Sequence, residues 1–170
     1  MKFICNRAIA FFLISSAFLL AAAGCKKSSN NNGGSGTMSA TVNGTAWANN
    51  YPVVGVYATS GSSGTFELIG LQFKSGDSTS LALDFVSPIV LNQPISTNTS
   101  SLIAAYTDSK SGAGYGALLG LGNATVTITS YDSTGHSIGG TFNGVLYNEA
   151  TLTDSITVTN GKFSSSFTVN

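Results

Sequence analysis

The sequence predicts an all-β protein: an antiparallel β-sandwich of about nine or ten short strands, with a small β-barrel as the alternative. Three observations predict it. Short runs of alternating apolar and polar residues recur at spacings of roughly 8–15 residues. Turn signals rich in Gly, Asn and Ser separate these runs. No stretch after Cys25 has the periodicity of an amphipathic helix. A single domain of roughly 130 residues can bury about two-thirds of its unfolded surface, so it needs no disulfide or metal.

The last part of the chain shows the strand pattern most clearly. Val126 and Ile128 alternate with Thr residues, and we expect both to face the core. Asp132–His136 is predicted to be a hairpin loop with Gly135 at positive φ. Asn160-Gly161 is a strong hairpin signal and predicts a two-residue turn between two further strands. The strands expected here are Thr125–Tyr131, Ser137–Tyr147, Ser155–Thr159 and Lys162–Val169.

The earlier strands are expected to close over the apolar face of this meander. Asn43-Gly44 predicts a tight turn, and Trp47 after it is expected to be a core anchor. The run Thr65–Lys74 is apolar on both faces, which indicates either a central strand or a bulge at Gly70. Pro88–Ser101 is irregular and is expected to cross between sheets, with Ile89–Leu91 as a candidate edge strand. The strands expected here are Met38–Val42, a short run around Trp47, Val53–Thr59, Thr65–Lys74, Ser80–Val86, Leu102–Thr107 and Tyr115–Leu121.

Residues 1–24 have the features of an export signal. Lys2 and Arg7 precede an apolar run, Ala8–Ala23, that is too short for a comfortable membrane span. The sequence Ala22-Ala23-Gly24-Cys25 resembles the lipobox of bacterial lipoproteins, with Ala22 where Leu is usual. The resemblance implies cleavage before Cys25 and acylation of its thiol and new amino group, with palmitate among the expected chains. Such chains would anchor the protein in a membrane. The alternative is an ordinary secretory signal followed by a chance Cys.

The segment 25–37 is expected to be a lipidated Cys and a flexible tether, because it holds almost only Lys, Ser, Asn and Gly. Twelve such residues span on the order of 20 Å. The folded domain is expected over 38–170, which carries three Lys and seven acidic residues. This negative charge argues against nucleic acid as a partner.

Four segments of the domain resemble a family of uncharacterised Bacteroidetes lipoproteins. They are Ala40–Gly44 followed by Trp47, Val126–Asp132, Ile138–Phe142 and Val158–Phe163. The matching residues form hairpins rather than a recognisable active site. The resemblance implies an all-β lipoprotein domain of unknown function, and it supplies no catalytic residue.

Three short motifs resemble the O-glycosylation sequon of Bacteroidetes, in which Asp precedes the modified Ser or Thr. They are Asp77-Ser78-Thr79, Asp132-Ser133-Thr134 and Asp154-Ser155-Ile156. The resemblance implies that Ser78, Ser133 and Ser155 are candidate modification sites. The alternative is a chance match in a chain rich in Ser and Thr.

The sequence predicts no catalytic residue, no metal site and no cofactor. His136 is the only histidine, and Asp132, Ser133 and His136 lie too close together in one loop to form an oriented triad. Zinc would need several His or Cys ligands, and calcium binding is not indicated because no Asp-x-Asp-x-Asp run is present. Asp84 is the one acid in mid-strand, on a face shared with Ala82 and Val86. It is either partly buried, with a shifted pKa, or an edge residue facing solvent.

The tyrosines are the remaining candidates for a binding surface. Tyr131 and Tyr147 are expected to face away from the core residues of their strands, and Tyr115 is the third candidate for contact with a glycan or a partner. The alternative is that they cover sheet surface or pack beneath loops. The Ser- and Gly-rich loops Ser60–Gly64 and Asp108–Gly114 would complete a glycan site.

We therefore expect a lipid-anchored, non-catalytic protein of the cell envelope that binds or scaffolds a partner. The alternatives are a glycan-binding module of a polysaccharide system and, third, a hydrolase. Lys26 and Lys27 follow the Cys, where an Asp would favour retention at the inner membrane and acidic residues would favour surface export. The expected location is therefore the outer membrane, with its periplasmic leaflet favoured over the cell surface.

Overall fold

The computed structural model describes residues 36–60, 63–98, 102–118 and 120–170. The predicted signal peptide 1–24, the candidate acylation site Cys25 and the tether up to residue 35 lie outside the described residues. The first described residue, Gly36, is buried, and the first strand begins at Thr37, one residue before the predicted start of the domain.

The described residues form twelve strands and no helix. The strands are β1 (Thr37–Val42), β2 (Thr45–Ala48), β3 (Tyr51–Ser60), β4 (Ser63–Lys74), β5 (Asp77–Val86), β6 (Pro94–Ser96), β7 (Leu102–Asp108), β8 (Ala113–Ala117), β9 (Asn123–Asp132), β10 (Ser137–Asn148), β11 (Ser155–Ser166) and β12 (Thr168–Val169).

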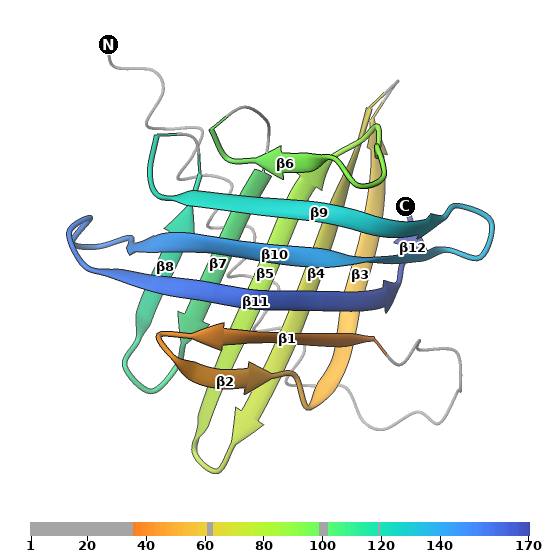
Figure 1. The fold of residues 1–170 in the computed structure, drawn as a ribbon. Helices are drawn as coiled ribbons and strands as arrows, with labels where there is room; N and C mark the ends of the chain where they lie inside the picture. Colours follow the sequence, from red (N-terminus) through yellow and green to blue (C-terminus); the bar gives the residue numbers. More distant parts are fainter. Residues whose placement is uncertain (1–35, 61–62, 99–101, 119) are drawn as a thin grey trace. The chain divides into compact units, whose positions relative to one another are not determined.

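The strands form two layers that pack face to face. The first sheet has the order β12-β3-β4-β5-β7-β8, and the second has the order β6-β9-β10-β11-β1-β2. The strands of the two layers cross steeply (Figure 1), as in orthogonal sandwiches. A short pairing of β8 with β10 joins the layers at one corner, and the chain passes from β11 into β12 at another.

The predicted all-β sandwich is therefore confirmed, and the sheet does not close into a barrel. The strand number is twelve rather than nine or ten. Two of the strands, β6 and β12, are too short for alternation to reveal them in the sequence. Every strand pair is antiparallel except that of β12 with β3.

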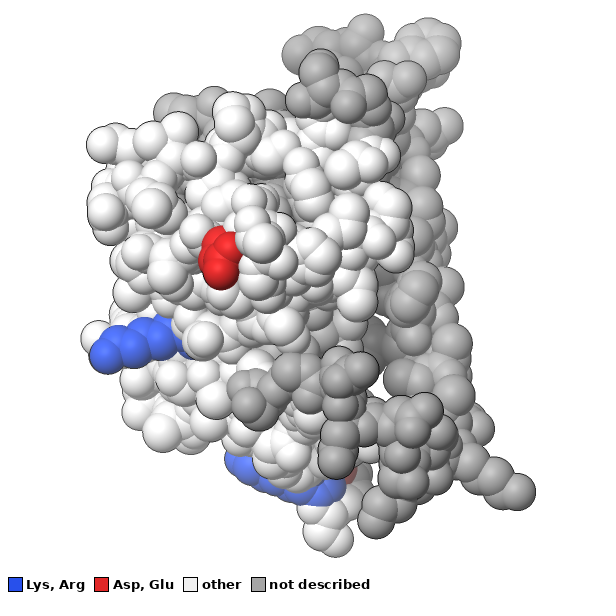
Figure 2. Space-filling view, turned by 90° about the vertical axis from the view of Figure 1, so that its right-hand side faces the viewer, with Lys and Arg blue, Asp and Glu red and all other residues white. Residues whose placement is uncertain are grey.

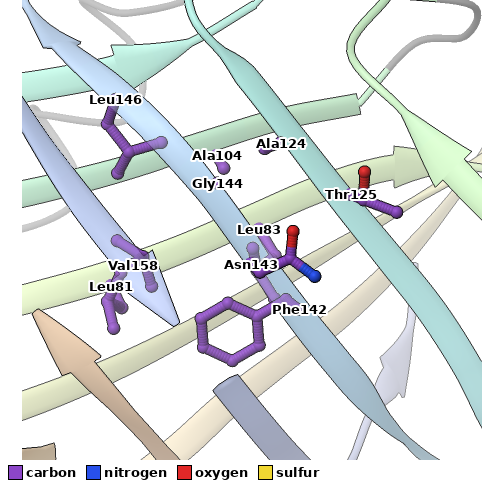
Figure 3. A pocket seen from close by; sticks show the side chains of 10 residues that line it. All are labelled: Leu81, Leu83, Ala104, Ala124, Thr125, Phe142, Asn143, Gly144, Leu146 and Val158. Atoms are coloured by element: carbon purple, nitrogen blue, oxygen red, sulfur yellow. The ribbon is translucent and has the colours of Figure 1, made fainter. Parts of the chain in front are cut away.

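Apolar side chains from both sheets fill the space between the layers. Phe66, Leu83 and Ile128 are among the fully buried side chains. Trp47 is a core anchor as predicted: it is buried, and its Nε1 donates a hydrogen bond to Thr79 Oγ1 at 2.8 Å. One gap in this packing has a volume of about 10 Å³ and is lined mainly by apolar side chains (Figure 3). A space that barely admits one water cannot hold a ligand.

Two of the predicted turns are confirmed. Asn43 and Gly44 have φ of 46° and 77° and connect β1 to β2, as expected for a two-residue hairpin turn. Asp132–His136 connects β9 to β10, but the positive φ lies at His136 (49°) and not at Gly135. The Asp132 carboxylate accepts hydrogen bonds from the backbone N–H groups of Thr134 and Gly135, which holds the loop without that conformation at Gly135.

The prediction of a hairpin at Asn160-Gly161 is wrong. Both residues lie inside one continuous strand, β11, where the register to β1 and β10 shifts as in a β-bulge. Asn160 takes the positive φ of 54°. Gly161 is buried, and a Cβ there would meet the Phe142 carbonyl oxygen and lie 2.6 Å from Phe142 Cδ2. The Asn-Gly pair thus forms a bulge in β11, which has a neighbouring strand on each side.

The two open questions about the middle of the chain are also settled. β4 pairs with β5 without interruption through Gly70, so the run that is apolar on both faces is a central strand and not a bulge. The irregular segment after Pro88 does cross between the sheets. Its short strand is β6, which pairs with β9, and Ile89–Leu91 forms no strand.

Candidate functional site

Tyr131 does not face outward as predicted. Its ring centroid lies 5.7 Å from that of Phe66 and 6.0 Å from that of Phe167, within the aromatic end of the core. The register of β9 against β10 shifts so that Ser130 pairs with Gly139 and Ile128 with Gly140. The extra residue between them reverses the alternation, and Tyr131 consequently points to the same side as Ile128.

Tyr115 and Tyr147 lie near each other at the corner where β8 meets β10, far along β10 from Tyr131. Tyr115 packs against the core beside Tyr106, with ring centroids 6.4 Å apart, and its hydroxyl donates to Asp154 Oδ2 at 3.1 Å. Tyr147 is half-buried opposite Gly116. The fold therefore does not bring the three tyrosines together, and the stacking platform expected from them does not form.

The three candidate O-glycosylation sites differ in accessibility. Ser78 is half-buried at the start of β5, and its hydroxyl donates to Ser109 Oγ at 3.1 Å. Ser133 is exposed in the β9–β10 hairpin, and Ser155 is exposed as the first residue of β11. An exposed hydroxyl at a hairpin or strand end is the more accessible acceptor, so Ser133 and Ser155 remain the better candidates.

The described residues also bear on a metal site and on the single histidine. No group of three or more His, Cys, Asp or Glu side chains in 36–170, gaps apart, could hold a metal ion. His136 is exposed, with its ring 5.4 Å from that of Phe167.

In the same part of the chain, no helix has the length and hydropathy that crossing a membrane requires.

The outer face of the first sheet is apolar, which is unusual for the solvent side of a sandwich. The second sheet lies against the inner side of β3, β4, β5, β7 and β8, and the alternate residues of these strands point the other way (Figure 1). Val54 is 52 % exposed there, and Val56, Ile69, Leu71, Ala82 and Ile103 are half-buried. We call this surface the outer apolar face. Its main apolar residues are Val54, Val56, Ile69, Leu71, Ala82 and Ile103.

Two carboxylates lie at the centre of the outer apolar face. Glu67 of β4 is the direct cross-strand partner of Asp84 of β5, with Val56 and Ile103 as the next partners on either side. The Oδ1 atom of Asp84 is buried and has no hydrogen-bond partner among the described residues. Burial, and to a smaller extent the charge of Glu67, raise the pKa of Asp84 to about 7. Burial also raises the pKa of Glu67. Such perturbed acids are a common mark of functional sites.

The sequence indicated half of this pair. Asp84 stood out because it lies in mid-strand next to Ala82 and Val86, and of the two readings the structure supports partial burial. Glu67 was missed, although its position between Phe66 and Leu68 is equivalent. The signal that could have found it is the central-strand pattern of Thr65–Lys74, in which Glu67 is the only charge on an otherwise largely apolar outer side.

A shallow polar depression lies on the outer face of the second sheet. It has a volume of about 590 Å³ and forms where the Gly161 bulge leaves space between the side chains of β1, β10 and β11. Its polar lining consists of Ser39, Thr141, Asn143, Asn160 and Lys162. Neither this depression nor the internal gap contains an acidic residue, so neither encloses the carboxylate pair. Figure 2, which shows one side of the molecule, has only a few scattered charged side chains.

The fold and the site define a β-sandwich with an apolar outer face and a central acid pair. Comparison of the chain with protein-family models, with curated proteins and with solved structures found no match.

The raised pKa of Asp84 predicts an inverted pH dependence of stability. Between about pH 4 and pH 7 the folded state holds a proton on Asp84 that the unfolded chain has lost, so the free energy of unfolding falls as the pH rises through this range. Asp84→Asn removes this loss. At pH 8 the free energy of unfolding of the variant should therefore be about 2–4 kcal/mol higher than that of the wild type. Urea denaturation at pH 5 and pH 8 measures both effects.

Two further variants control this prediction. Glu67→Gln removes the neighbouring negative charge. Its free energy of unfolding should therefore fall less with rising pH than that of the wild type. Thr134→Ala changes an exposed, uncharged side chain of the β9–β10 hairpin and should leave the pH dependence as it is. Equal slopes for Asp84→Asn and the wild type would contradict the raised pKa.

Proposed function

We propose that this chain is a lipid-anchored, non-catalytic envelope protein that binds a partner through the outer apolar face. The observation that carries the binding role is the apolar character of a sheet surface that points away from the second sheet. Contiguous apolar surface outside a core marks interaction sites, because leaving it in water costs free energy. The small volume of the gap between the described sheets supports the same proposal, because that gap has no room for a ligand.

The position of the first described residue relates the anchor to this face. A Cβ on Gly36 would lie 2.7 Å from Val53 Cβ, so the chain enters the domain beside β3. The exposed Tyr51 and Val54 on the same strand begin the outer apolar face. An acylated Cys25 on a flexible tether of this length would keep the domain on the order of 20 Å from a membrane surface.

The remaining expectations belong to the same proposal. The chain would be a member of the uncharacterised Bacteroidetes lipoproteins that it resembles, in the outer membrane, with Lys26 and Lys27 favouring the periplasmic leaflet. Ser133 and Ser155 would be its better placed O-glycosylation sites.

A glycan-binding module is the second candidate, favoured by the polar depression rather than by the tyrosines. The hydroxyl and amide groups around Lys162 can donate and accept hydrogen bonds to sugar hydroxyls. Oligosaccharides that perturb the NMR signals of Lys162 and Thr141, and leave Ile69 unchanged, would distinguish this role from the first.

Cys25→Ser should abolish the membrane anchor. We expect the wild type to incorporate palmitate in cells and to enter the detergent phase of a phase separation, because two or three acyl chains give durable anchoring. The Cys25→Ser chain should incorporate no palmitate and accumulate uncleaved or in the aqueous phase. Ser28→Ala, three residues further on, is the control and should behave as the wild type. Palmitate labelling that survives in Cys25→Ser would contradict the lipid anchor.

A further inference from the structure

We propose that the outer apolar face binds a segment of a protein partner that presents one Lys or Arg among apolar side chains, with the cation between Asp84 and Glu67. The inference rests on the proposed binding role of this face and adds the chemistry of its occupant.

The charged side chains of the first sheet around the pair are acidic, except for one Lys at the end of the sheet. Lys74 is the only basic residue in β3, β4, β5, β7 and β8, and it lies at the end of β4 opposite Asp77. The nearest strands present Val54 and Val56 from β3, and Ile103 and Ala105 from β7. On the far side of β8, the Glu149 carboxyl carbon lies 3.4 Å from the position of a Cβ on Gly114 and adds a further negative charge. The face therefore offers an incoming cation no repulsion.

The carboxylate pair lacks the donors that such groups normally have. A buried carboxylate oxygen without a hydrogen bond is costly, and Asp84 Oδ1 is in this state. A Lys ammonium carries three donors and an Arg guanidinium carries five, so either could satisfy both acids at once. The cation would also remove the repulsion between Asp84 and Glu67, which are cross-strand partners.

The apolar surroundings decide what carries the cation. The acid pair is flanked by Val56, Ile69 and Ala82. The partner's groups on either side of the cation must therefore be apolar, because burying apolar surface against these residues is what favours binding. A second copy of this chain would bring a like-charged acid pair against the first. A phospholipid surface or a nucleic acid would bring phosphates. A protein segment with apolar residues on both sides of a Lys or Arg meets both requirements.

Binding of a cation favours the ionised acid pair, so affinity must increase with pH. Because the pKa of Asp84 is raised to about 7, Asp84 is largely protonated at pH 6 and largely ionised at pH 8. The affinity for a cationic segment should therefore rise about tenfold over this interval.

The test uses the mature acylated protein in phosphatidylcholine nanodiscs and fluorescent, acetylated and amidated peptides. In one peptide a Lys lies between Val residues, and in the matched peptides norleucine or Glu replaces that Lys. At pH 8 we expect the Lys peptide to bind about tenfold more tightly than the norleucine peptide, and the Glu peptide to bind least. Asp84→Asn should remove the preference for Lys and its pH dependence, whereas Asp132→Asn should keep both. Empty nanodiscs measure binding to the lipid.

Two other outcomes separate the inference from the proposed function. If the Lys and norleucine peptides bind equally and Ile69→Gln weakens both, the face is a binding surface and the cation preference is overturned. If no peptide binds, or if Ile69→Gln and Asp84→Asn both leave binding unchanged, the inference and the binding role of this face are overturned together. The lipid anchor is independent of either result, because palmitate labelling tests it.

Discussion

Phe66→Ala is expected to lower the free energy of unfolding by about 4 kcal/mol, the largest effect of a single substitution that we predict. Phe66 has no exposed surface and lies at the centre of an aromatic cluster between the two sheets. Its ring stacks on Tyr57 at 4.4 Å and on Phe85 at 5.5 Å, and meets Phe167 edge-on at 5.3 Å. Truncation removes these contacts and leaves a cavity that the surrounding rings cannot fill.

Urea denaturation at constant pH measures this loss, and Phe73→Ala is the matched control. Phe73 lies on the same strand but is 48 % exposed, with one edge contact to Tyr51. Its truncation should cost less than about 1 kcal/mol. If both variants lose equal stability, the cluster around Phe66 is not the packed centre of the domain.

Gly161→Ala should destabilise the domain by about 3 kcal/mol, because the added methyl would overlap the Phe142 backbone and ring. Gly76→Ala is the control. Gly76 has a φ of 77° in the β4–β5 hairpin, and a Cβ there would meet nothing within 4 Å, so only the backbone strain of about 1 kcal/mol applies. The comparison distinguishes the bulge from the hairpin turn that the sequence predicts. If Gly161 were a turn residue, Gly161→Ala would lower the free energy of unfolding only as much as Gly76→Ala does.

Most of the longer strands and two of the turns could be predicted because their causes are local. Inward residues such as Leu81, Leu83 and Phe85 recur with the period of a strand, and period-2 alternation needs no knowledge of the partner strand. The Asn43-Gly44 hairpin also depends on local chemistry, since both residues tolerate positive φ.

The bulges could not be predicted in this way. Whether Asn160-Gly161 ends a strand or lies inside one depends on the strands beside it, and β10 and β1 pair with β11 on both sides of the bulge. The extra residue before Tyr131 cannot be recognised in the sequence either, because it shows only in the register of β9 against β10. It moved Tyr131 from the expected binding surface into the aromatic core and with it removed the stacking platform.

By itself the sequence determined the fold class, the Asn43-Gly44 turn and the mid-strand position of Asp84. Only the tertiary structure decided that Glu67 lies opposite Asp84 and that apolar residues of β3, β5 and β7 surround the pair. The reason is register. Residues far apart in the chain become neighbours through the hydrogen-bonded pairing of whole strands, and a shift of one residue would turn each side chain to the other face. Desolvation, which raises the pKa of Asp84, is a property of that assembled surface and of no single strand.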